Sequence, residues 1–150
     1  MRQFVKDASA ITERWYKRRQ RDADDRRDPP NSQFKRDAYR LIRSYIDAGK
    51  ERVFEDVAAA DGRPKRLVTQ ARSNLFKLGL VAMFADEGML SDSDRNVYSK
   101  QMLYAYQHDV PPQLLVAFIG FAGSPARIAA KLASGEREPG FEFIDPPRQL

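Results

Sequence analysis

The sequence predicts an all-α domain of about six helices. Apolar residues recur at intervals of three or four along most of the chain, which is the period of an amphipathic helix. Glycines and prolines divide these stretches at helix-length intervals. With 150 residues, the chain is long enough to bury a core without metals or disulfides. We expect one helical domain over 1–135 and an irregular tail over 136–150, where Pro and Gly flank "FEFID".

The first helix is predicted from a stripe of apolar residues that share one helical face: Phe4, Ala8, Ile11 and Trp15. The apolar pattern then stops, and 17–31 reads "KRRQRDADDRRDPPN". Opposite charges recur four positions apart in this segment, as in Arg18 and Asp22. They allow either a salt-bridged extension of the helix or a linker, and the two prolines end it in both cases.

Helices are next predicted over 33–48, 51–60 and 64–79. Gly49 and Gly62 suit the C-terminal ends of the first two, and Pro64 suits the first turn of the third.

The segment 80–91 is predicted either as a small β-hairpin or as a continuation of the preceding helix. Three further stretches then predict a helix through about Gln107, an apolar core segment "QLLVAFIGFAG", and a short helix from Pro125 to Ser134.

Charge is distributed unevenly along the chain. Residues 1–82 hold 20 basic and 12 acidic groups, for a net charge of +8, whereas 83–150 hold 6 and 9, for a net charge of −3. A basic front half is typical of a protein that meets a polyanion or an acidic protein surface.

The stretch "VAAADGRPKRLVTQARSNLFKLGLV" matches five of seven positions of a helix-turn-helix template. The template places a small residue at Ala58, a glycine turn at Gly62, and apolar residues at Val57, Val68 and Ala71. Two positions that are apolar in the template are here Asp61 and Arg63.

The outward flank of the predicted helix 64–79 carries donors for phosphates and base edges, and no acidic residue occurs from 62 to 85. On duplex DNA we expect four residues to face the major groove, namely Arg66, Thr69, Gln70 and Ser73. We expect the phosphates to be held by Lys65, Arg72, Lys77 and the cluster Arg18, Arg19 and Arg21. The alternative is a core helix with a solvated basic face.

This segment resembles the helix-turn-helix and winged-helix DNA-binding superfamily over about 30 residues. The resemblance rests on "DVAAADGRPKRLVTQARSNLFKLGLV", in which a basic polar helix ends in a leucine-rich "LGLV". It implies that the helix is a recognition helix, followed by a two-stranded wing, and that the protein is a non-enzymatic DNA-binding transcription regulator. Asp86 and Glu87 would lie at the tip of that wing and would repel phosphate.

The competing hypothesis is a protein-interaction adaptor or inhibitor, whose basic front half docks on an acidic partner. Aromatic residues supply many interface contacts, and those expected to reach a partner are Phe76, Tyr98, Tyr104, Tyr106, Phe141 and Phe143. A homodimer would suit a palindromic DNA site, but the sequence leaves the oligomeric state open.

An enzyme is not expected, and neither is a metal or other cofactor. The chain has no Cys and a single His, His108, so neither a zinc cluster of these residues nor a histidine-based triad can form. "DSDRN" lacks the later glycine and glutamate of a calcium loop. No apolar run reaches membrane-spanning length, so we expect a cytoplasmic protein without membrane contact.

Overall fold

The fold is all-α, as the sequence predicts. The structure is a computed structural model that describes residues 1–84 and 88–150. In these two ranges the chain forms eight α-helices, one short 3₁₀ helix and no strand. The elements are α1 (Arg2–Arg21), α2 (Pro30–Asp47), α3 (Arg52–Ala60), α4 (Lys65–Ala71), α5 (Leu75–Met83), α6 (Asp92–Gln107), η1 (Pro112–Leu114), α7 (Leu115–Ala122) and α8 (Pro125–Ser134).

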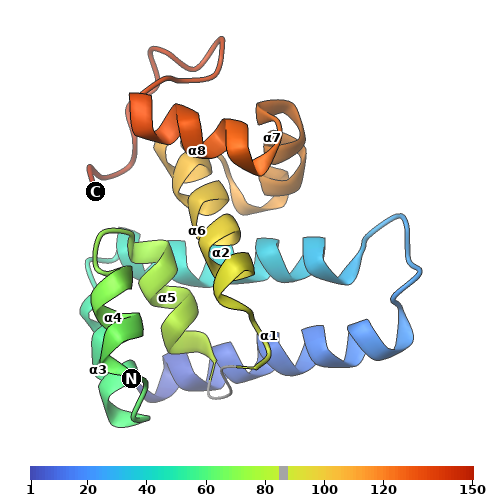
Figure 1. The fold of residues 1–150 in the computed structure, drawn as a ribbon, viewed down its shortest axis with the longest axis vertical. Coiled ribbons are helices and arrows are strands. Elements are labelled where there is room, and N and C mark those ends of the chain that lie inside the picture. Colours follow the sequence, from blue (N-terminus) through green and yellow to red (C-terminus); the bar gives the residue numbers. More distant parts are fainter. Residues whose placement is uncertain (85–87) are drawn as a thin grey trace.

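The two longest helices, α1 and α2, run side by side in opposite directions (Figure 1). The rings of Trp15 and Phe34 stack at 4.2 Å near one end of this pair. Near the other end, Phe4 packs against Tyr45 at 5.3 Å and against Phe54 of α3 at 5.5 Å. The apolar stripe predicted for the first helix therefore faces the core, with Phe4, Ala8 and Trp15 buried.

Helix α5 lies at the centre of the packing and contacts α1, α2, α3, α4 and α6. Its Gly79 lies so close to α2 that a Cβ there would stand 2.7 Å from Cγ1 of Ile42. Phe76 of α5 lies 5.6 Å from the ring of Tyr39 and 5.4 Å from that of Tyr106. A helix with its apolar residues on nearly every side is expected at such a position.

The last part of the chain forms the other end of the molecule, where α7, α8 and the tail surround the end of α6 (Figure 1). The tail, 136–150, contains no helix or strand. Side chains nevertheless fix it to the domain. Arg137 donates to the carbonyl of Gln107 at 2.6 Å, and Arg148 donates to the carboxylate of Glu51 at 2.9 Å.

Of the two alternatives predicted for 80–91, the continuation of the preceding helix is confirmed over 80–83, and no strand forms among the described residues of this segment. Residues 80–83 belong to α5, and Phe84 follows in an extended conformation. Asp86 and Glu87, the expected wing tip, lie outside the described residues. Ser91 caps α6, because its side chain accepts a hydrogen bond from the amide of Asp94 at 3.0 Å.

Most of the aromatic residues expected to reach a partner lie in the core. Phe76, Tyr104 and Tyr106 are fully buried and Tyr98 is 7% exposed. Their hydrophobic area is already used inside the fold, so these side chains are not available to a partner. Phe141 packs on Phe118 at 5.7 Å, whereas Phe143 is 96% exposed.

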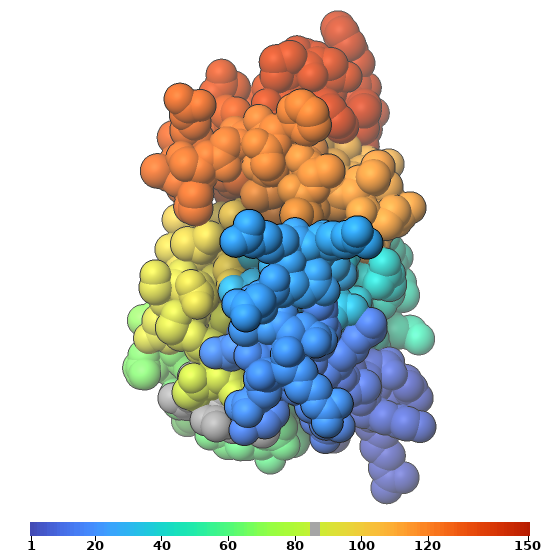
Figure 2. All heavy atoms as spheres, turned by 90° about the vertical axis from the view of Figure 1, so that its right-hand side faces the viewer, coloured from blue at the N-terminus to red at the C-terminus, as the bar shows by residue number. Residues whose placement is uncertain are grey.

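The charged segment 17–31 is partly helical and partly irregular, with α1 ending at Arg21. Arg18 organises the connection between α1 and α2. It donates to the carboxylates of Asp22 at 3.2 Å and Asp25 at 2.9 Å, and to the carbonyl of Asp28 at 2.8 Å. Figure 2 shows this connection in blue in the middle of one face of the molecule.

Within the described residues, no single helix is both long and apolar enough to cross a bilayer. The pair Pro112–Ala122 and Pro125–Ser134 reaches that length and composition only when taken together, and a bend of 94° separates its two parts.

Candidate nucleic-acid interface

The turn between α3 and α4 has the backbone geometry of a Schellman motif. Gly62 has a φ of +67°, which is favourable for glycine and costly for other residues. Its amide donates to the carbonyl of Ala59 at 3.2 Å, and the amide of Arg63 donates to that of Ala58 at 2.9 Å. The predicted chain reversal at Gly62 is therefore confirmed.

Arg63 is the polar residue at one of the two template positions that are usually apolar, and its contacts explain why it is tolerated there. Its side chain is only 5% exposed. Nε donates to the carbonyl of Val81 at 3.1 Å and Nη2 to that of Ala82 at 3.4 Å. These carbonyls lie in the last turn of α5, where a cation is favourable. The guanidinium thus joins the turn before α4 to the C-terminal end of α5.

Helix α4 presents one buried side and one open side. Leu67 and Ala71 are buried beneath it. The open side carries four exposed residues, Lys65, Arg66, Thr69 and Gln70. This arrangement fixes the backbone through the buried side and leaves the polar side chains accessible.

The predicted helix 64–79 is wrong in one respect, because it is divided into α4 and α5. Asn74 has an extended backbone, and its side chain accepts hydrogen bonds from the amides of Phe76 at 3.0 Å and Lys77 at 3.3 Å. Such capping starts a new helix. Ser73 consequently lies in the turn between the helices, exposed, and the half-buried Lys77 belongs to α5.

Salt bridges hold only part of the cations around α4. Arg72 is paired with Glu55 at 2.9 Å, and both side chains are largely open to solvent. In the part of the chain that the structure describes, neither Lys65 nor Arg66 forms an ion pair. Because exposed pairs are weak, Arg72 can exchange Glu55 for a phosphate.

Sequence reasoning missed one cation of this surface. Arg52, the first residue of α3, is exposed and lines the same shallow hollow as Arg72 and Glu55. Its position was not evident, because only the fold brings the start of α3 beside the end of α4. We call the group Arg52, Lys65, Arg66, Thr69, Gln70, Arg72 and Ser73 the α4 surface.

The cluster at the end of α1 does not belong to the α4 surface. Phe4, near the start of α1, contacts α3, whereas Arg18, Arg19 and Arg21 lie at its far end (Figure 1). A helix of 20 residues is about 30 Å long. The side chain of Arg18 is 15% exposed and pairs with several aspartates, so it is not available to phosphate. The guanidinium of Arg19 lies 4.6 Å from the ring of Trp15.

The packing of α4 differs from the expected helix pair, since α4 makes its main contacts with α5 and not with α3. The two helices of the template are thus connected through α5, which contacts both.

Among the described residues, no three His, Cys, Asp or Glu side chains gather closely enough to hold a metal ion. Comparisons of the chain with protein-family models, with curated proteins and with solved structures gave no match.

Proposed function

We propose that this protein binds duplex DNA through the α4 surface without catalysing a reaction. The observation that carries the proposal is the open side of α4, where two cations that pair with no carboxylate of residues 1–84 or 88–150 stand beside Thr69 and Gln70. The cations attract phosphates, while hydroxyl and amide groups form hydrogen bonds to phosphates or base edges.

The size of α4 fits one groove contact. Its 7 residues span about 10 Å, and a major groove is about 12 Å wide. Arg66 suits a guanine edge and Gln70 an adenine edge, since both can form two hydrogen bonds with those bases. Lys65, Arg72 and Arg52 flank them and suit phosphates.

An acidic protein surface is the second candidate, because Lys65 and Arg66 also attract carboxylates. Thr69 and Gln70 favour DNA, because uncharged hydrogen-bonding side chains on a helix provide base contacts that a carboxylate surface does not need.

The test is fluorescence anisotropy with a labelled duplex over a series of salt concentrations. If Arg52, Lys65 and Arg72 meet phosphates, log affinity should fall with log salt at a slope of about −3. The double substitution K65E/R66E should abolish binding without lowering the melting temperature, because both side chains are exposed. A slope near zero would remove the proposal.

The matched control is R19E/R21E. It makes the same change of charge near the C-terminal end of α1, away from the α4 surface. DNA affinity should fall much less in this variant than in K65E/R66E. Equal losses would mean that DNA responds to overall charge only, and the proposed surface would then be wrong. If the parent protein binds an acidic protein partner but no DNA, the second candidate is favoured.

A further inference from the structure

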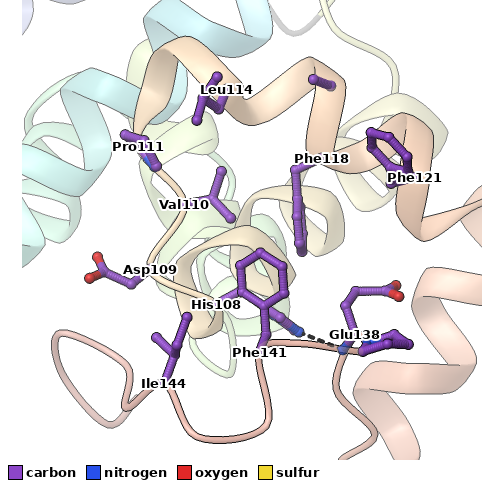
Figure 3. Close-up of a pocket in the computed structure, with 12 residues that line it drawn as sticks. His108, Asp109, Val110, Pro111, Leu114, Phe118, Phe121, Glu138, Phe141 and Ile144 are labelled. Carbon is purple, nitrogen blue, oxygen red and sulfur yellow. Dashed lines mark hydrogen bonds between the residues drawn. The ribbon is translucent and has the colours of Figure 1, made fainter.

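A hollow of about 710 Å³ lies at the end of the molecule formed by α7 and the tail. Three parts of the chain enclose it: the connection after α6, helix α7 and residues 138–144 of the tail (Figure 3). We call it the tail cavity. Its volume falls within the range of sites that enclose small molecules, and no residue of the α4 surface lines it.

The base of the tail cavity is aromatic. The ring of His108 lies 5.0 Å from that of Phe118 and 5.3 Å from that of Phe141, and the two phenylalanine rings are 5.7 Å apart. Figure 3 shows these three rings together, with Leu114 and Phe121 on the α7 side and Ile144 on the tail. Rings in such a cluster favour contact with a further ring, stacked or edge-on.

His108 offers its ring to the cavity but no free nitrogen. Nδ1 lies 2.7 Å from the carbonyl oxygen of Tyr104, and Nε2 accepts a hydrogen bond from the amide of Glu138 at 2.9 Å (Figure 3). Nδ1 therefore carries the hydrogen and donates a hydrogen bond to the carbonyl of Tyr104. Both ring nitrogens are thus occupied within the protein.

Each of the two carboxylates of the wall already accepts a hydrogen bond from a cationic side chain of the protein. Asp109 accepts from Arg43 at 2.5 Å, and Glu138 accepts from Lys131 at 2.7 Å. Neither Arg43 nor Lys131 lines the cavity. An anionic molecule would lose its hydration there without gaining a cation, and a highly polar one would find few free hydrogen-bonding groups.

The mouth of the tail cavity is apolar and open. Phe121 is 91% exposed and Leu114 is 52% exposed. An exposed apolar patch beside a concave apolar site is typical of binding surfaces. From the volume, the aromatic base, the occupied polar groups and the missing cation, we infer that the tail cavity binds an uncharged aromatic molecule of a few rings.

The test compares two probes that differ by one charge. N-phenylnaphthylamine is uncharged at neutral pH, and anilinonaphthalene sulfonate is its sulfonated analogue. Titrated into the full chain, the uncharged probe should show saturable fluorescence with one site per chain. The sulfonated probe should bind at least about tenfold more weakly. Equal binding of the two probes would overturn the proposed selectivity.

Substitutions then locate the site. Ala117 lines the cavity and is exposed, so A117W fills the space without disturbing the core. A130W is the matched control, since Ala130 is exposed on α8 outside the cavity. A charge placed in the same space by L114D should also weaken the probe. Loss in A117W and L114D but not in A130W is the expected result.

Other occupants give other results. One such result is that no probe binds and that the chain is a dimer which A117W dissociates. A second copy of the chain would then cover the cavity, and the proposal would be wrong. Undiminished probe binding in A117W and L114D would likewise exclude this site. Duplex binding by K65E/R66E is measured separately, so failure of one proposal leaves the other unaffected.

Discussion

The side chain of Arg63 and the carbonyl of Val81 form a hydrogen bond of 3.1 Å across 18 positions of sequence. This bond lets a polar residue take the place of an apolar one in the turn before α4. It also fixes the start of α4 relative to α5, on which α4 rests.

Replacing Arg63 by alanine should lower the free energy of unfolding by about 1.5–3 kcal/mol, which is typical for buried hydrogen bonds to a charged group. Urea denaturation measures the change. R66A is the control, because Arg66 is exposed and its removal should change stability by less than about 0.5 kcal/mol. Equal stabilities of R63A and R66A would contradict the role given to Arg63.

Replacing Gly79 by alanine should destabilise the fold by about 1–3 kcal/mol, because the new Cβ overlaps the side chain of Ile42. Gly120 in α7 provides the contrast, since a Cβ there meets nothing within 4 Å. G120A should therefore be neutral or stabilising by up to about 1 kcal/mol. Thermal unfolding of both variants checks the pair; a G79A protein as stable as the parent would refute the close packing of α2 and α5.

Acidification should loosen the tail through His108. Burial lowers the pKa of His108, so the folded state favours the neutral imidazole over the protonated one. The stabilisation is complete above the unfolded pKa of about 6.5 and is lost as the pH falls below it toward the folded value. The charged groups nearest to the ring are Glu138, Arg137 and Lys131. A protonated Nε2 would meet the amide of Glu138, donor against donor.

Urea unfolding at pH 7.5 and pH 5.5 tests this dependence. The difference in stability between the parent and H108Q should shrink as the pH falls, by at most about 1.4 kcal/mol per pH unit. Other titrating groups act on both proteins and cancel. A constant difference between the two proteins would show that His108 does not titrate in this range.

Removing Arg18 should release the connection between α1 and α2. In R18Q the amides of residues 22–28 should exchange with solvent faster, because Asp22, Asp25 and the carbonyl of Asp28 lose their shared donor. R21Q should leave this exchange unchanged, since Arg21 is exposed. Neither variant should change DNA affinity by as much as K65E/R66E. A comparable loss in R18Q would mean that the cluster Arg18, Arg19 and Arg21 also binds DNA.

Removing the carboxylate of Glu55 should strengthen DNA binding. E55Q frees Arg72 from its ion pair of 2.9 Å and removes one negative charge from the α4 surface. D56N removes the same charge from the exposed neighbouring residue. The affinity should rise more in E55Q than in D56N, as measured by anisotropy at one fixed salt concentration. Equal gains would mean that the ion pair does not restrain Arg72.

Helical periodicity predicted the all-α fold, but it did not predict the break at Asn74. The apolar stripe continues in phase from Leu67 to Ala82, so two helices read as one. Phe76, which lies off that stripe, was the visible sign of the break. Its ring is buried against Tyr39 on α5, the helix that begins after Asn74.

Contacts between distant parts of the chain were not predictable from local patterns. Arg148 reaches Glu51 across 97 positions, and Arg52 joins Arg72 only in the folded molecule. The pattern of opposite charges at 17–31 left a salt-bridged helix and a linker open; Arg18 does pair with Asp22 at 3.2 Å, but α1 ends at Arg21. The polar flank of α4 was predicted from its place opposite the apolar stripe of the helix, and the absence of acidic residues between 62 and 85 was the argument for DNA.

The two sides of α4 differ in what they contribute to folding, and this difference affects how the protein can evolve. Leu67 and Ala71 hold the helix in place, while Arg66, Thr69 and Gln70 contribute nothing to the core. Exchanges at these three outer positions cost little folding free energy. These three positions, which carry the proposed recognition of DNA, can therefore vary while the scaffold stays the same.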